Sequence, residues 1–130
     1  MIGCVAIIPC TTGNFIGIKC SKGRGLILPG GGWESDKDPT YHHAAAREAF
    51  EETSIKIDHQ RLKYLWHGPD GFGYQTIAFL HQGLCDLPSV KLPEGEPTIV
   101  TPQDTYASKF AAWYRILFEV CHDQLWPFVQ

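Results

Sequence analysis

The stretch LPGGGWESDKDPTYHHAAAREAFEETSI, residues 28–55, decides the fold, because it joins a run of glycines to a predicted helix with an unusual charge pattern. We expect this helix to begin at Asp38-Pro39, with Asp38 as its N-cap, and to continue to about Thr53. At about 100° per residue, one helix face collects three carboxylates beside an arginine: Arg47, Glu48, Glu51 and Glu52. The opposite face, which should pack on a core, carries Ala46, Ala49, Phe50 and Thr53.

The crowded carboxylates indicate a cation site. Like charges three and four residues apart on a helix repel each other by a few tenths of a kcal/mol per exposed pair. A hard divalent ion that takes oxygen ligands would offset this repulsion. Mg²⁺ is the simplest candidate, with Mn²⁺ as the alternative.

Composition narrows the class of protein. The 130 residues are expected to form one domain, residues 1–130, with an ordinary hydrophobic content of 44%. A net charge of −3 gives no support for binding a nucleic-acid polymer or an anionic membrane surface. No apolar run approaches the ~18 residues of a membrane span. The five scattered cysteines lack any CxxC pair, which favours reduced thiols and a cytoplasmic location.

The rest of the chain reads as strands, one helix, strands and a second helix around a mixed sheet. The predicted strands are Ile2 to Ile8, Phe15 to Cys20, Leu26 to Leu28, Arg61 to His67, Gly73 to His81 and Thr98 to Val100. A second helix is predicted from Tyr106 to Cys121, after a connection and helix start at 101–104. The glycines after Pro29 should allow backbone conformations closed to other residues. The apolar tail at 126–129 should dock on the body or on a second subunit, which leaves a homodimer open.

Two parts of the 28–55 stretch together resemble the signature of the Nudix hydrolases. Pro29-Gly30-Gly31-Gly32 is similar to the entry of that signature, and residues 47–53, REAFEET, follow its second half position by position. The resemblance is to the small MutT-like members in particular. It implies an αβα sandwich with a mixed central sheet, and cleavage of a nucleoside diphosphate linked to another group.

This chain departs from the family pattern at two points. Two extra residues stand in the loop from Ser35 to Asp38, so the family's isolated glutamate, which supports the arginine, is replaced by Asp38, or alternatively by Asp36. Ser54 stands where the family has glycine; a left-handed serine at a helix C-cap should cost about 1 kcal/mol relative to glycine. Neither departure removes a carboxylate.

The resemblance implies hydrolysis of a phosphoanhydride by metal-activated water. Glu48 and Glu52 would be the main ligands, Glu51 would bind directly or through water, and the Gly30 carbonyl would be a further ligand. Arg47 would orient the glutamates. The general base stays open: Glu52, Glu48, or a later-loop glutamate, Glu94 or Glu96, which otherwise belongs to an exposed turn.

The sequence says less about the substrate-binding residues than about the metal ligands. Lys22 or Arg24 could contact a phosphate, since their loop leads into the glycine run at Gly31. Tyr114 aligns with the family's base-reading position near the final helix, where an aromatic ring can stack but cannot form paired amide hydrogen bonds. Further base-stacking candidates, each also a candidate core residue, are Trp66, Phe72, Tyr74 and Trp113.

Three functions therefore remain. The first is a nucleotide pyrophosphohydrolase acting on nucleoside di- or triphosphates. The second is a hydrolase of nucleotide sugars or dinucleoside polyphosphates. The third is a Nudix-fold module that binds a nucleotide without turnover, which three intact glutamates argue against.

Overall fold

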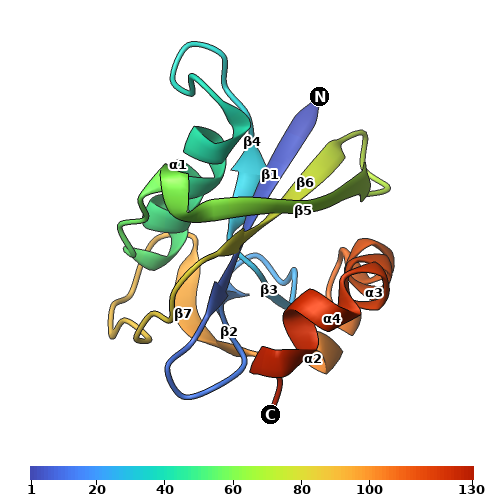
Figure 1. Cartoon of the computed structure of the whole chain (residues 1–130). Coiled ribbons are helices and arrows are strands. Elements are labelled where there is room, and N and C mark those ends of the chain that lie inside the picture. The colour runs from blue at the N-terminus through green and yellow to red at the C-terminus, as the bar shows by residue number, and fades with distance from the viewer.

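A computed structural model describes all 130 residues as a mixed α/β sandwich (Figure 1). The sheet has seven strands in the order β3-β2-β1-β6-β5, with β4 paired to β1 and β7 paired to β2. The strands are β1 Ile2–Pro9, β2 Phe15–Cys20, β3 Leu26–Ile27, β4 Gly30–Gly32, β5 Leu62–Pro69, β6 Gln75–His81 and β7 Gly95–Val100. The helices are α1 Tyr41–Thr53, α2 Pro102–Tyr106, α3 Ala111–Val120 and α4 His122–Leu125, with short 3-10 turns η1 His59–Arg61 and η2 Trp126–Phe128.

Strand β1 is the centre of the sheet. It runs parallel to β6, antiparallel to β4, and pairs at its end with β2. Seven of its eight residues are buried, which confirms the strand predicted from the apolar run at its start. Because β4 pairs with β1, the glycines are fixed at the middle of the sheet.

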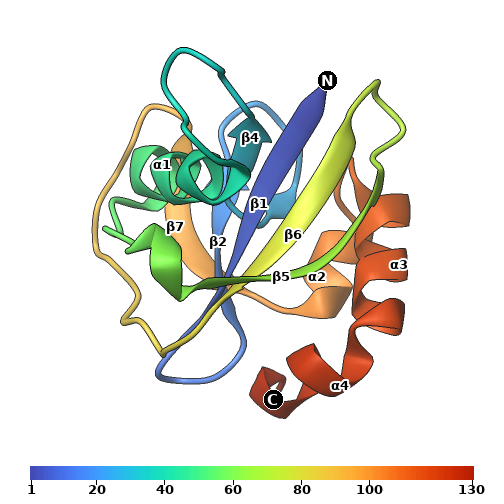
Figure 2. The same cartoon turned by 45° about the horizontal axis from the view of Figure 1, so that its top comes forward.

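The two faces of the sheet carry separate cores. Alternation along β1 sends Cys4, Ala6 and Ile8 to the side of α1 and Val5 and Ile7 to the side of α3. Figure 2 shows α1 and the α2–α4 group on opposite sides of the strands. The predicted αβα sandwich with a mixed sheet is confirmed.

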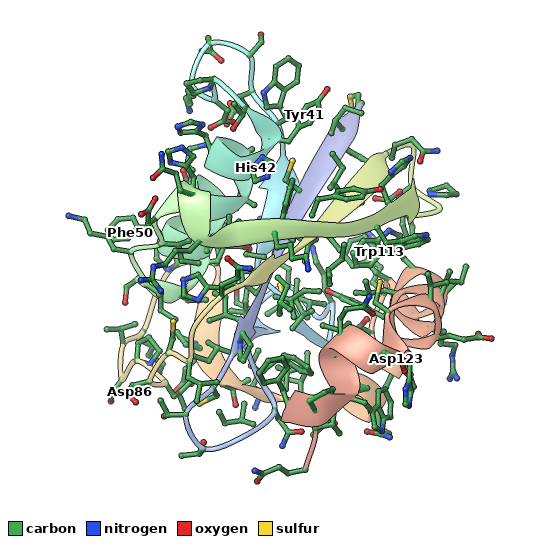
Figure 3. All side chains as sticks on the ribbon, in the orientation of Figure 1. Tyr41, His42, Phe50, Asp86, Trp113 and Asp123 are labelled. Carbon is green, nitrogen blue, oxygen red and sulfur yellow. The ribbon has the colours of Figure 1, made fainter.

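The predicted start of α1 is wrong, and its predicted buried face is correct for Ala49 and Thr53 but wrong for Phe50. Thr40 is the N-cap, and its hydroxyl accepts a hydrogen bond from the His43 N–H, while Asp38 lies outside the helix. Phe50 is 48% exposed and points away from the body (Figure 3), whereas Glu52 is only 8% exposed. The buried face is therefore turned toward the carboxylates, since the alanines at 44, 45 and 49 allow α1 to lie close to the sheet.

The helix predicted from Tyr106 to Cys121 is confirmed over α3 but is wrong at its start, because the chain breaks between α2 and α3. The buried Ser108 hydroxyl donates to the Thr105 carbonyl and accepts from the Phe110 N–H. These side-chain bonds replace helical ones and turn the backbone between the two helices.

The tail forms η2 and packs on its own chain. Phe128 lies edge-on against Phe15, with ring centroids 6.3 Å apart, and its carbonyl accepts from the Asn14 N–H. A homodimer stays a prediction. No helix combines the length and the apolar character that crossing a bilayer requires.

Candidate active site

The glycine strand β4 provides space for the carboxylates of α1. None of its residues has a positive φ, so the prediction that these glycines serve an unusual backbone conformation is wrong. They allow close approach instead: a Cβ on Gly31 would lie 2.5 Å from the Glu48 carboxylate, and one on Gly30 would lie 2.6 Å from Val5. A Cβ on Gly32 would meet nothing nearer than Tyr74, at an ordinary contact distance of 3.5 Å. Gly31 is thus the glycine that Glu48 requires.

Glu52 is a buried carboxylate held by the backbone of the same strand. Its Oε1 accepts a hydrogen bond of 2.7 Å from the Gly30 N–H. Burial, and to a lesser degree the charges of Glu48 and Glu94, raise the pKa of Glu52 to about 8, although that hydrogen bond acts in the opposite direction. A carboxylate in this state can take up a proton near neutral pH.

Arg47 joins the loop before α1 to the carboxylates on it. Its Nε and Nη2 donate to the two oxygens of Asp38 at 2.9 and 2.8 Å, and Nη2 also donates to the Gly32 carbonyl at 3.1 Å. Its Nη1 donates to Glu48 at 2.9 Å and to Glu51 at 3.3 Å. The hydrogen bond from Arg47 holds the pKa of Asp38 below its usual range. Of the two aspartates proposed to support the arginine, Asp38 makes these contacts.

Negative charge exceeds positive charge in this cluster. Burial raises the pKa of Glu48, and the charge of Glu51 raises it further. The same charges reach the buried Cys4 thiol, whose pKa is raised to about 12, first by burial and then by Asp38 and Glu48. Arg47 is the single cation in direct contact with these groups.

The carboxylates of Glu48, Glu51 and Glu52 are chemically suited to bind a divalent metal ion. The available side-chain donors are carboxylate oxygens, which Mg²⁺ and Mn²⁺ accept. Glu52 is buried and Glu48 is largely buried, and besides burial a neighbouring carboxylate raises the pKa of each, Glu48 that of Glu52 and Glu51 that of Glu48. No three acidic, histidine or cysteine side chains are gathered as a ready-made metal site, since Arg47 holds Glu48 and Glu51.

A cavity of about 310 Å³ opens beside β4. It is lined by Gly30, Gly31 and Gly32 together with several aromatic side chains. Two cations also line it, Arg24 and Lys109. Its volume lies at the lower end of the range of small-molecule pockets, which suits a ligand the size of one nucleotide.

The aromatic candidates separate into two groups. Phe72, Tyr74 and Trp113 line the cavity, whereas Trp66 packs behind it against Trp113, with ring centroids 5.7 Å apart. Tyr114 also contributes to the wall, but it is 2% exposed and its hydroxyl accepts a hydrogen bond from the Leu28 N–H. The prediction that Tyr114 stacks on a base is therefore wrong, because its ring faces are covered by protein.

A second hollow adjoins the first on the side of Glu48. Gly32 and Tyr74 line both, and Met1, Ile2, Trp33 and Glu34 complete the second. Of the α1 carboxylates, Glu48 lines this second hollow, and none lines the first cavity.

The later-loop glutamates lie outside both hollows. Glu94 is exposed at the start of β7, near enough for its charge to act on Glu52. Glu96 pairs in register with Lys19 across β2 and β7. Of the two, Glu94 is therefore the one that faces the cluster.

Comparison with known proteins settles the family. A family model of the NUDIX domain matches residues 4–117. The chain belongs to the Nudix family. Nudix hydrolase 16, mitochondrial, of Arabidopsis thaliana is 51% identical over 39 residues, a segment covering 30% of this chain and 21% of that protein.

Two solved Nudix structures show how widely this fold is shared. The MutT protein of Methanosarcina mazei has a TM-score of 0.65 at 24% identity, covering 95% of this chain and 94% of the other. The NUDIX domain of Shewanella oneidensis NrtR, solved in complex with ADP-ribose, has a TM-score of 0.68 at 12% identity, covering 96% and 88%. At these identities the likeness establishes the fold alone.

The structure brings together most of the residues proposed for a Nudix site. The carboxylates of Glu48 and Glu52 lie against β4, and Arg24 lines the cavity, but Lys22 does not. Lys109 was missed, because it falls in a segment predicted as regular helix. Its backbone N–H donates to the Arg24 carbonyl, a contact between distant segments that sequence spacing does not reveal.

Proposed function

We propose that this chain is a metal-dependent hydrolase that cleaves the phosphoanhydride bond of a small nucleoside diphosphate-containing substrate. The observation that carries the proposal is a pair of carboxylates, the buried Glu52 and the largely buried Glu48, facing a glycine strand beside an arginine held by Asp38. The cavity next to this pair has the size and the aromatic and cationic lining of a nucleotide site.

The chain's own groups have distinct tasks in this proposal. Arg47 orients Glu48 and Glu51 through Nη1, and the Gly30 N–H orients Glu52. A Mg²⁺ or Mn²⁺ ion held by Glu48, Glu51, Glu52 and the Gly30 carbonyl would neutralise phosphate charge and acidify the attacking water.

Glu52 is our choice of proton acceptor, because its raised pKa suits that task near neutral pH. Glu48, Glu94 and Glu96 are the alternatives. Arg24 lines the cavity and its charge acts on Glu52, so it is placed to bind a phosphate next to the bond that is cut.

A second candidate is hydrolysis of a larger substrate, such as a nucleotide sugar or a dinucleoside polyphosphate. The second hollow beside Glu48 favours it, because a group attached to the distal phosphate could lie against Trp33 and Tyr74. The ADP-ribose bound by the NrtR domain has this two-part form. The five unpaired thiols fit a reducing compartment, which we propose to be the cytoplasm.

The test is a panel of nucleoside di- and triphosphates, nucleotide sugars and dinucleoside polyphosphates, assayed with Mg²⁺ and Mn²⁺ for phosphate and pyrophosphate release. Glu52→Gln should lower the rate by a factor on the order of 10³ while leaving the circular dichroism spectrum unchanged. Glu119→Gln, at an exposed position of α3, is the matched control and should retain full activity.

Two results would count against the proposal. Unchanged turnover in Glu52→Gln would remove Glu52 from the mechanism. A wild-type protein that binds nucleotides but cleaves none of the panel would instead be a non-catalytic Nudix module.

A further inference from the structure

The aromatic end of the cavity carries a lysine that the proposed chemistry does not use. Phe72 and Phe110 lie edge to face with ring centroids 5.4 Å apart. The Nζ atom of Lys109 lies 4.7 Å from the Phe72 centroid and 5.9 Å from that of Phe110. All salt bridges of the chain lie elsewhere, so this ammonium group rests on aromatic rings and keeps its donors available.

The backbone fixes the position of Lys109. Its N–H donates to the Arg24 carbonyl at 3.0 Å, and the neighbouring Gly25 lies so close to Ser108 that an added Cβ would stand 3.1 Å from its Cα. The two cations of the cavity therefore come from segments that are tied together.

Arg24 and Lys109 nevertheless have different surroundings. The guanidinium of Arg24 lies over no aromatic ring and forms no salt bridge, so it is available to a phosphate. The ammonium group of Lys109 lies over the rings of Phe72 and Phe110. Arg24 is thus suited to the phosphate end of a nucleotide, and Lys109 to the end that holds a planar ring.

An acceptor stands at the same end of the cavity. Asp70 lines it, and its Oδ1 accepts from the N–H groups of Phe72 and Tyr74 at 2.7 and 3.2 Å. These bonds shape the turn that carries Phe72 between β5 and β6. The other oxygen, Oδ2, has no hydrogen-bond partner in the protein.

Lysine can only donate and an ionised aspartate can only accept, so together they suit a base with a keto oxygen beside ring N–H groups. Guanine has this order, with O6 as acceptor and N1–H and the N2 amino group as donors, while adenine carries an amino donor at the corresponding position. We propose that Lys109 and Asp70 make this site selective for 6-oxopurine nucleotides, guanine above all, over adenine nucleotides. The inference rests on the proposed function only in taking the cavity as the nucleotide site.

Binding of non-hydrolysable ligands tests the inference without turnover. The ligands are the α,β-methylene analogues of GDP, IDP and ADP, titrated with and without Mg²⁺ by calorimetry. Wild type should bind the GDP and IDP analogues about tenfold more tightly than the ADP analogue. Lys109→Met keeps an unbranched chain over the rings but removes the donors; it should weaken GDP and IDP analogues about tenfold and change the ADP analogue less than about twofold.

Two further variants sharpen the result. Asp70→Asn keeps an oxygen for the turn and should weaken the GDP analogue more than the ADP analogue. Lys63→Met removes an exposed lysine on β5 outside the cavity and should bind all three ligands as wild type does.

Different results would overturn this inference and the proposed function. If Lys109→Met weakened all three ligands equally, the lysine would bind the phosphates and the inference would be overturned. The inference would also be overturned if Lys109→Met weakened none of the ligands, or if the wild-type protein bound none of the three. Selective binding without hydrolysis of any nucleotide would overturn the proposed function alone. Hydrolysis that is equally fast for guanine and adenine nucleotides would leave the proposed function and remove this inference.

Discussion

At the scale of single residues, Arg47 determines how the site is assembled. A guanidinium carries five N–H donors in a fixed plane, and here these donors contact Asp38, Gly32, Glu48 and Glu51. The family signature predicted Arg47 and, as its supporting carboxylate, Asp38 with Asp36 as the alternative. It did not predict the contact with Gly32, because a backbone carbonyl of another strand leaves no trace in side-chain spacing.

Arg47→Lys keeps the positive charge but removes the planar guanidinium group, so it tests the geometry of the N–H donors separately from the charge. A lysine cannot reach both oxygens of Asp38 and Glu48 together, so the carboxylates should lose their orientation. We expect kcat/KM to fall about 10- to 100-fold, with a raised requirement for Mg²⁺, because residues that orient metal ligands typically have effects of this size. Steady-state kinetics across a Mg²⁺ titration measure both changes, and wild-type values for both would contradict this role.

At the scale of elements, the glycine strand and the helix are matched to each other. The sequence predicted the helix and most strands, because apolar runs, turn residues and the signature are local patterns, but it did not predict that the glycine run forms the strand β4. It did not predict that the glycines of β4 are selected for space, since this depends on how near α1 lies. For the same reason it placed Phe50 in the core and missed the break around Ser108, where a side chain takes over the backbone bonds.

Two neighbouring glycines offer a matched pair of variants. Gly31→Ala places a methyl group against Glu48 and should lower kcat/KM at least about tenfold while the fold is kept, because displaced ligands impair metal-assisted hydrolysis. Gly32→Ala makes the same chemical change but meets Tyr74 and the Ile2 carbonyl at ordinary contact distances, so it should lose much less activity than Gly31→Ala does. Equal activities in the two variants would show that Glu48 tolerates displacement.

The end of α1 carries a measurable strain. Ser54 has a φ of 63°, and its N–H donates to the Phe50 carbonyl, as expected for a left-handed helix cap. Ser54→Gly should therefore stabilise the protein by about 1 kcal/mol and raise Tm by about 3 °C. Thermal and urea unfolding would measure the change, and a Tm below that of wild type would indicate that the serine side chain has a role of its own.

At the scale of the whole molecule, the buried carboxylates link stability to pH. Glu52 has a pKa of about 8 in the fold against an ordinary value of 4.5, so the folded state holds its proton more firmly than the unfolded state. Its contribution to stability is complete below about 4.5 and is lost as pH rises to about 8. Glu48, whose pKa is also raised, acts in the same direction. Asp38 acts in the opposite direction, in acid, because its pKa is lowered.

The free energy of unfolding of the metal-free protein should accordingly fall from pH 5.5 to pH 8.5. The fall should be roughly 1–3 kcal/mol larger in the wild type than in the Glu52→Gln variant. Thermal unfolding in EDTA at the two pH values measures the difference. Mg²⁺ should restore more stability at the higher pH, where the carboxylates are ionised, and less in Glu52→Gln. Identical pH profiles for the two proteins would show that Glu52 is not a buried acid.

The position of residue 1 governs how the protein should be handled. The Met1 carbonyl accepts from the Gln75 N–H, and Met1 and Ile2 line the hollow that adjoins Glu48. Any peptide fused ahead of them would leave the body within reach of the carboxylates, and a polyhistidine tag would bring competing metal ligands there. Gln130 lies at the other end of the molecule (Figure 1), beside Gly13 and Asn14. Affinity tags and fluorescent labels for every assay above therefore belong on the carboxyl end.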